Sequence, residues 1–130
     1  MFFEYCLIVT GDAEFNDYPL LRKKCDNYLR NNVKNGENIV IMSAGNDQGA
    51  DNLGEKYANE RGYTVRRFNP DWNKYGTKAR FIRNSQMINN SDGFIAFTSP
   101  YCENTSITNS FINAARNKRL NVKVVREEED

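Results

Sequence analysis

The 130-residue chain contains no histidine. Histidine is the side chain that most often acts as a general base near neutral pH, and it is the commonest ligand of transition metals. Any catalysis by this chain must therefore rely on carboxylates, cysteine, tyrosine, lysine or water. We expect neither a metal site nor a cofactor.

Cysteines are also few: Cys6, Cys25 and Cys102 are odd in number and have no paired spacing. This pattern indicates neither a disulfide framework nor a zinc site and fits a reducing compartment. Cys102 lies in a polar stretch before an expected helix, where a thiol can become nucleophilic. Because no histidine accompanies it, we favour an unreactive thiol.

Long hydrophobic runs are absent, and none approaches the roughly 20 residues that cross a bilayer. The first residues, "MFFEY", lack the basic start and the cleavage site of a signal peptide. We therefore expect a cytoplasmic protein with no membrane partner.

The net charge is only +1, which disfavours nucleic acid as a partner. The charge is uneven, however, because residues 61–83 hold seven basic side chains against the single acidic Asp71. The basic residues are Arg61, Arg66, Arg67, Lys74, Lys78, Arg80 and Arg83. This strip favours a small anionic ligand over a long polyanion. We expect one domain over residues 1–126 and an acidic, solvated tail at 127–130.

The hydrophobic pattern alternates between strands and helices. It predicts strands at Tyr5–Thr10, Asn38–Met42, Tyr63–Phe68, Gly93–Thr98 and Asn121–Val125. It predicts helices from an Asp17 N-cap to about Val33, around Leu53–Arg61, at Lys78–Asn89 and at Thr105–Lys118, with a loop at Asn69–Thr77. Five strands alternating with four helices predict an α/β fold, a three-layer sandwich around a mainly parallel sheet.

Three polar loops, "TGDAEFND", "SAGNDQGAD" and "TSPYCENTS", follow the first, second and fourth expected strands. Ligands of such sheets bind beyond the carboxyl ends of the strands. In the second loop, Gly45 and Gly49 could let the backbone and the next helix N-terminus hold an anion. An ordinary glycine turn, with Asp51 or Asp47 capping the helix, explains the same residues equally well.

Other candidate residues also have two interpretations. Thr10 and Gly11 could belong to the same site or merely begin a loop. Arg83 is either a bidentate phosphate partner or a solvated surface charge. Trp72 and Tyr75 could stack on a nucleobase or fill the edge of the core.

Four motifs occur in order along the chain: "SAGNDQGAD", "DWNKYG", "RNSQM" and, less well preserved, "NT" at 104–105. Together with "IVTG" and "DYPLLRKKCD", they resemble the SLOG superfamily, specifically its small stand-alone YspA-like branch in bacteria and phages. The corresponding family pattern is S-G-G-A-x-G-A-D, D-W-x-x-x-G, R-N-x-x-M and G-T. The resemblance covers nearly the whole chain.

This resemblance implies a Rossmann-like fold with strand order 3-2-1-4-5 that binds nucleotides or nucleotide-derived ligands. Relatives include the LOG phosphoribohydrolases, which cleave nucleoside monophosphates, and sensor domains proposed to bind NAD or ADP-ribose-type signals. The ligand-binding positions carried onto this chain are Thr10, Gly11, Ser43, Gly45, Gly49, Asp51, Arg83, Asn84 and Thr105. If the source is a phage, the protein would act in the host cytoplasm.

The chain departs from the pattern at Ala44, at Asn46-Asp47-Gln48 and at Asn104. Arg83 matches the catalytic arginine of the LOG enzymes, but Ser106-Ile107-Thr108 lacks their glutamate. We therefore expect a sensor or sequestering protein for a nucleotide-type small molecule. An N-glycosidase that uses Arg83 with Asp51 or Asp47 is the alternative, and a nucleic-acid-binding module is the third. The sequence leaves open the base, the number of phosphates and whether the chain forms a homo-oligomer.

Overall fold

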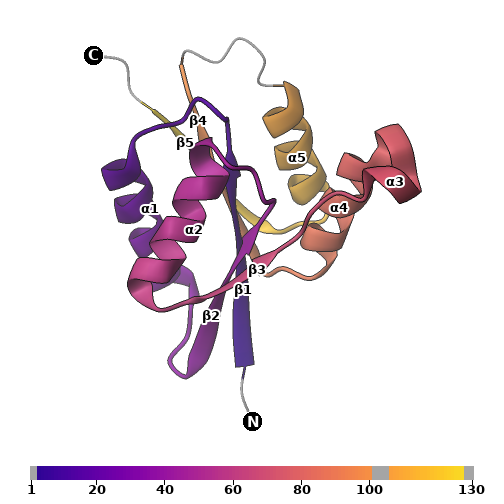
Figure 1. Cartoon of the computed structure of the whole chain (residues 1–130). Helices are drawn as coiled ribbons and strands as arrows, with labels where there is room; N and C mark the ends of the chain where they lie inside the picture. The colour runs from indigo at the N-terminus through magenta and orange to yellow at the C-terminus, as the bar shows by residue number, and fades with distance from the viewer. Residues whose placement is uncertain (1–2, 101–105, 128–130) are drawn as a thin grey trace.

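The computed structural model describes residues 3–100 and 106–127 (Figure 1). The strands are β1 (Phe3–Gly11), β2 (Glu37–Ser43), β3 (Thr64–Arg67), β4 (Gly93–Thr98) and β5 (Asn121–Arg126). The helices are α1 (Tyr18–Asn32), α2 (Gly49–Arg61), α3 (Trp72–Tyr75), the 3-10 turn η1 (Gly76–Lys78), α4 (Ala79–Asn89) and α5 (Ser106–Asn117). None of the helices in these ranges is long and apolar enough to cross a membrane.

The strands form one sheet in the order β3-β2-β1-β4-β5, and all four pairings are parallel. The expected fold class and strand order are therefore confirmed. Strand order reverses between β1 and β4, because the chain leaves β1 toward one edge of the sheet and β4 toward the other. Such a reversal is where ligands bind in open α/β sheets.

Helices cover both faces of the sheet, as Figure 1 shows, with α1 and α2 on one side and α4 and α5 on the other. Alternate residues of β1 point to opposite faces: Leu7 and Val9 pack in the first core, and Cys6 and Ile8 in the second. A strand covered on both faces must be apolar throughout. This explains the uninterrupted apolar run in the sequence.

The helix termini follow the expected signals in part. Asp17 caps α1 by accepting a hydrogen bond from the Leu20 N–H at 3.1 Å, and Gly62 ends α2 in the left-handed conformation. The expected loop at 69–77 is wrong in its second half, where α3 and η1 occur. Asp71 caps α3 through the Lys74 N–H, so a local side-chain bond stabilises a single turn that periodicity cannot reveal.

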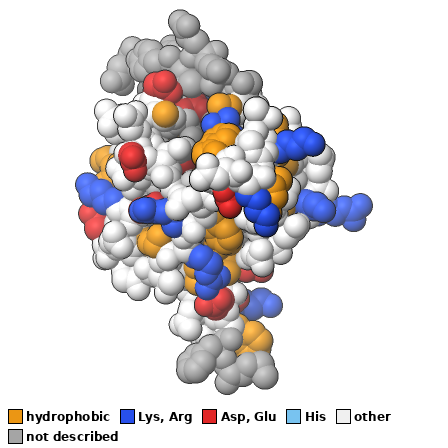
Figure 2. All heavy atoms as spheres, turned by 45° about the vertical axis from the view of Figure 1, so that its right-hand side comes forward, with side chains coloured by type: hydrophobic (Ala, Val, Ile, Leu, Met, Phe, Trp, Pro, Cys, Tyr) orange, Lys and Arg blue, Asp and Glu red, His pale blue; other side chains and the backbone are white. Residues whose placement is uncertain are grey.

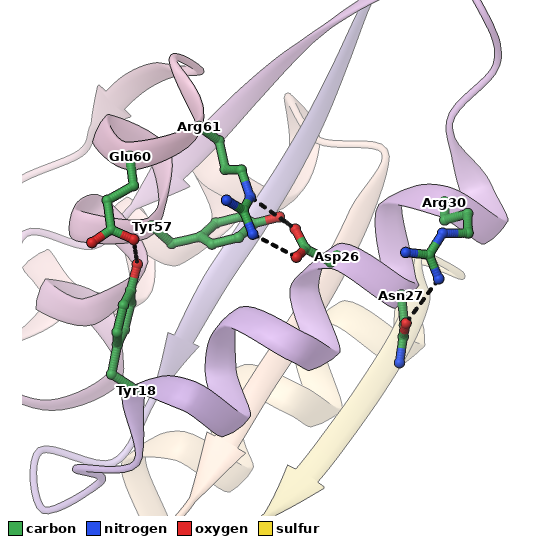
Figure 3. Close-up of polar contacts among 7 residues, drawn as sticks. All are labelled: Tyr18, Asp26, Asn27, Arg30, Tyr57, Glu60 and Arg61. Atoms are coloured by element: carbon green, nitrogen blue, oxygen red, sulfur yellow. Dashed lines mark hydrogen bonds and ion pairs between the residues drawn. The ribbon is translucent and has the colours of Figure 1, made fainter.

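Polar side chains join α1 to α2 (Figure 3). The Tyr57 hydroxyl donates to Asp26 Oδ1 at 2.5 Å, and Arg61 donates to both Asp26 oxygens, at 3.1 and 2.7 Å. From the start of α1, the Tyr18 hydroxyl donates to Glu60 at 2.5 Å. We call Asp26, Tyr57 and Arg61 the interhelix cluster.

Candidate functional site

A cavity of ≈ 530 Å³ opens at the carboxyl ends of the central strands. These strand ends lie near the top of Figure 1. Its walls come from the end of β1, the loop after β2, the first turn of α2, the start of α4 and the start of α5. The lining residues are Thr10, Gly11, Asp12, Ala13, Glu14, Ala44, Asn46, Asp51, Arg80, Arg83, Asn84, Ile107, Thr108 and Phe111. The cavity therefore lies where the strand order reverses.

Arg83 is buried in the cavity wall and held by the protein through two of its nitrogens. Nη1 donates to the carbonyl oxygen of Ala44 at 2.8 Å, and Nε donates to Asn84 Oδ1 at 2.8 Å. Burial lowers the pKa of Arg83, but a guanidinium remains protonated. The remaining nitrogen, Nη2, donates to no other described residue and is available to a ligand.

Asn84 provides a second donor beside Arg83. Because its Oδ1 accepts from Arg83 Nε, its Nδ2 is left as a donor, and Nδ2 bonds to no other described residue. Asn84 is buried yet lines the cavity. Arg83 and Asn84 are consecutive residues of α4 and give one wall of the cavity a charged donor and a neutral donor. This arrangement suits an anion or another hydrogen-bond acceptor.

Asp51 is the buried carboxylate of the site, with a relative exposure of only 1%. Oδ1 accepts from the Thr10 hydroxyl and Oδ2 from the Asn46 amide, each at 2.7 Å. Burial raises its pKa from the ordinary 3.8 to about 6, against the hydrogen bonds and the positive charge of Arg83. The surroundings of Asp51 therefore favour its protonated form more than those of an ordinary aspartate do.

Asp12 is a site residue that the sequence analysis did not single out. Its carboxylate accepts from the Ser99 N–H at 2.9 Å and the Thr108 hydroxyl at 2.5 Å, and its carbonyl oxygen accepts from the Ala50 N–H at 3.3 Å. It thereby ties the loop after β1 to α2, to the end of β4 and to α5. These partners are remote in sequence, so no local pattern could have revealed the role.

The structure brings together five of the predicted ligand-binding residues. Thr10, Gly11, Asp51, Arg83 and Asn84 all line the cavity. Their common position agrees with the expectation that the carboxyl ends of the strands form one site, while their role in binding stays a prediction.

Other predicted residues do not line the cavity. The Ser43 hydroxyl donates to Glu55 at 2.6 Å and accepts from the Gly45 N–H at 3.1 Å. Asp47 is exposed and is not among the residues that line the cavity. Thr105, and the thiol of Cys102, lie outside the described residues.

Gly49 serves packing within the site rather than contact with the cavity. Its φ is +73°, and a Cβ atom here would lie 2.3 Å from the Asp12 carbonyl oxygen. The close approach of α2 to the Asp12–Ala13 backbone therefore requires glycine.

The expected capping of α2 by Asp51 or Asp47 is wrong. The N-cap residue is Gln48, which makes no side-chain cap bond. Asp51 bonds to Thr10 and Asn46 instead.

Trp72 lies outside the cavity lining, on α3. Its side chain is 49% exposed and belongs to neither core cluster, so it does not fill the edge of the core. The guanidinium carbon of Arg80 lies 5.6 Å from the centre of the Trp72 ring. Tyr75 is similarly paired with Lys74, at 5.1 Å.

Part of the chain matches a known protein family. A family model for the YspA, cpYpsA-related SLOG family (YAcAr) matches residues 6–75, which is 70 of the 130 residues. The chain belongs to this family. The matched part of this SLOG protein includes Thr10, Gly11, Asp51 and Trp72, whereas Arg83 and the α5 wall lie beyond it. Searches of curated proteins and of solved structures found no significant match.

Membership of the SLOG family implies a possible role in binding a nucleotide-derived ligand, and it identifies no specific ligand. The cavity offers donors at Arg83 and Asn84, an acceptor at Asp51 and an apolar patch at Ile107 and Phe111. Within residues 3–100 and 106–127, no group of histidine, cysteine and carboxylate side chains could hold a metal ion.

Proposed function

We propose that this SLOG protein binds a nucleotide or nucleotide-derived ligand, of the NAD, ADP-ribose or nucleoside phosphate type, as a sensor or a sequestering protein. The observation that carries the proposal is the Arg83–Asn84 pair: both residues line the cavity at the reversal of strand order, and each keeps one nitrogen donor without a partner among the described residues. A volume of ≈ 530 Å³ falls within the roughly 300–1,000 Å³ typical of small-molecule sites.

The chemistry of the walls suggests how such a ligand would lie. A phosphate would bind to Arg83 Nη2 and Asn84 Nδ2, because charge-assisted hydrogen bonds are the strongest polar contacts available there. A ribose hydroxyl would donate to Asp51, whose oxygens retain lone pairs for a further donor. The base would pack against the apolar side of the cavity at Ile107 and Phe111.

The test is a thermal-shift panel of nucleoside phosphates, NAD and ADP-ribose on the wild type and on Arg83→Ala. The wild type should be stabilised by at least one compound, and Arg83→Ala should weaken its binding roughly hundredfold because a buried charged donor is lost. The ligand-free melting temperature of the variant should stay within a few degrees of the wild type.

Arg116→Ala is the matched control, because Arg116 is an exposed arginine near the end of α5, outside the cavity lining. It should bind like the wild type. If Arg83→Ala does not fold, Arg83→Lys keeps the charge but loses the planar fork and should still weaken binding. Equal ligand-induced stabilisation of the wild type and of the Arg83 variants would overturn the proposal.

Nucleotide hydrolysis is a second candidate function, favoured by Asp51. A carboxyl group with a pKa of about 6 beside an arginine can exchange protons during glycosidic cleavage. Chromatography after incubation with nucleoside monophosphates, NAD and cyclic ADP-ribose tests this directly. Hydrolysis would be established if the wild type releases a free base and Asp51→Asn does not. The control is Asp47→Asn, a change at an exposed residue outside the cavity lining, which should still release the base. If the wild type releases no base, only the binding function remains.

A further inference from the structure

Arg80 connects the cavity to an exposed aromatic ring. Its side chain lines the cavity, and its guanidinium carbon lies 5.6 Å from the centre of the Trp72 ring. Arg80 therefore lies against Trp72, and Trp72 is still 49% exposed. Trp72 does not line the cavity itself, but it contacts a residue that does.

The segment around Trp72 is positively charged and lacks ion pairs among the described residues. Lys74 and Lys78 are exposed, and no described carboxylate lies within ion-pairing distance of them or of Arg80. The nearby Asp71 is occupied as the cap of α3. Figure 2 brings the side of α3, α4 and α5 forward and shows lysine and arginine side chains spread over this face.

A stacking role explains these features together. An exposed tryptophan ring gives up the stabilisation that its burial would contribute to folding. A cation on one face of the ring orients it and leaves the other face uncovered. Nucleobases stack on aromatic side chains, and cations hold the phosphates between successive bases. Phe81 is a useful contrast, since it is more exposed, at 62%, but does not line the cavity.

We propose that Trp72 and Arg80 form a second nucleobase subsite, so that the preferred ligand carries two bases joined through phosphate. This inference rests on the proposed function of the cavity. The first base and its phosphate lie in the cavity against Arg83, Arg80 binds the linking phosphate, and the second base stacks on Trp72. Two sources share this chemistry: a free dinucleotide and the terminal nucleotides of a single strand.

The chain contains a single tryptophan, so its fluorescence reports on this subsite alone. The experiment titrates the protein with adenosine monophosphate, NAD, diadenosine tetraphosphate and a short oligothymidylate, under selective tryptophan excitation. A two-base ligand should quench Trp72 and bind roughly tenfold or more tightly than the monophosphate. A steep loss of affinity with salt would identify the single strand as the source.

Trp72→Ala should remove this gain while leaving binding of the monophosphate unchanged, and Trp72→Phe should restore part of it. Phe81→Ala, which removes another exposed aromatic ring, should bind every ligand like the wild type. Equal affinity for one-base and two-base ligands, or a gain that survives Trp72→Ala, overturns the second subsite. In that case Arg83-dependent binding of the monophosphate would still support the proposed function, whereas binding of no compound would overturn both.

Discussion

Asp26 and Asp51 are carboxylates on neighbouring helices, and their surroundings shift their pKa values in opposite directions. In the interhelix cluster, hydrogen bonds from Arg61 and Tyr57 lower the pKa of Asp26 despite partial burial. In the cavity, burial is the largest effect and raises the pKa of Asp51 to about 6. The folded state therefore favours the charged form of Asp26 and disfavours the charged form of Asp51.

The difference lies in how completely the protein satisfies its own polar groups. Arg61 is directed at both oxygens of Asp26, so the interhelix cluster is closed on itself (Figure 3). In the cavity, Arg83 makes no direct hydrogen bond to Asp51 and is held by Ala44 and Asn84, with one nitrogen left over. We therefore expect the interhelix cluster to stabilise the fold, and we propose the cavity, where donors remain without partners among the described residues, as the ligand site.

Asp26→Asn should produce the largest change in stability. The amide would present N–H groups to the donors of Arg61, and the variant should melt roughly 5–8 °C below the wild type by circular dichroism. Asp47→Asn, the same change at an exposed position, should leave the melting temperature unaltered. A stable Asp26→Asn variant would contradict a stabilising role for the interhelix cluster.

Asp51→Asn should have the opposite sign and raise the melting temperature by roughly 3–5 °C at about pH 7, because it removes a buried charge. The amide fits the site, since the Thr10 hydroxyl can turn to accept while Asn46 still donates. The same variant should lose ligand affinity. A destabilised Asp51→Asn would show that the carboxylate is needed for folding.

The opposite pKa shifts of Asp26 and Asp51 predict that their contributions to stability depend on pH in opposite ways. A lowered pKa makes the contribution of Asp26 present above about pH 4 and lost as the pH falls further. A raised pKa makes the burial of Asp51 costly above about pH 6 and less so toward pH 4, where the carboxyl is protonated. The stability gained in Asp51→Asn should therefore shrink as the pH falls below about 6 and disappear only below the ordinary pKa of 3.8, and a gain independent of pH would contradict this cause.

Glu60→Gln should have the smallest effect. The contact between Tyr18 and Glu60 is exposed, and a glutamine can still accept from the hydroxyl. Exposed polar pairs contribute little, so the melting temperature should change by less than about 2 °C. A larger loss would mean that the whole α1–α2 interface, and not the interhelix cluster alone, depends on polar contacts.

Most of the fold could be predicted because buried parallel strands leave uninterrupted apolar runs, as in β1 and β4. Helix signals such as Asp17 and Gly62 act through their immediate neighbours, and they too were readable. The single turn of α3 was missed because it depends on one capping bond from Asp71. The strand order came from the family resemblance and not from any local pattern.

The candidate site was predicted less completely. Residues at strand ends, such as Thr10 and Gly11, lie in the cavity because parallel strands end at a common edge. The packing of Gly49 against the Asp12 backbone could not be predicted, because in sequence it looks like any glycine turn. Asp12 itself was missed because its partners Ser99 and Thr108 are 87 and 96 residues away.

The most direct test of the central claim, that the cavity around Asp51, Arg83 and Asn84 is the ligand site, is a nuclear magnetic resonance titration of the wild type. The ligand is the nucleotide that gives the largest thermal shift. We predict shifts concentrated at Thr10, Gly11 and Asn46 and at the side-chain Nε of Arg83, with the signals of Asp26 and Tyr57 unchanged. Shifts confined to the α1–α2 interface, or none at the Arg83 side chain under saturating ligand, would contradict the account.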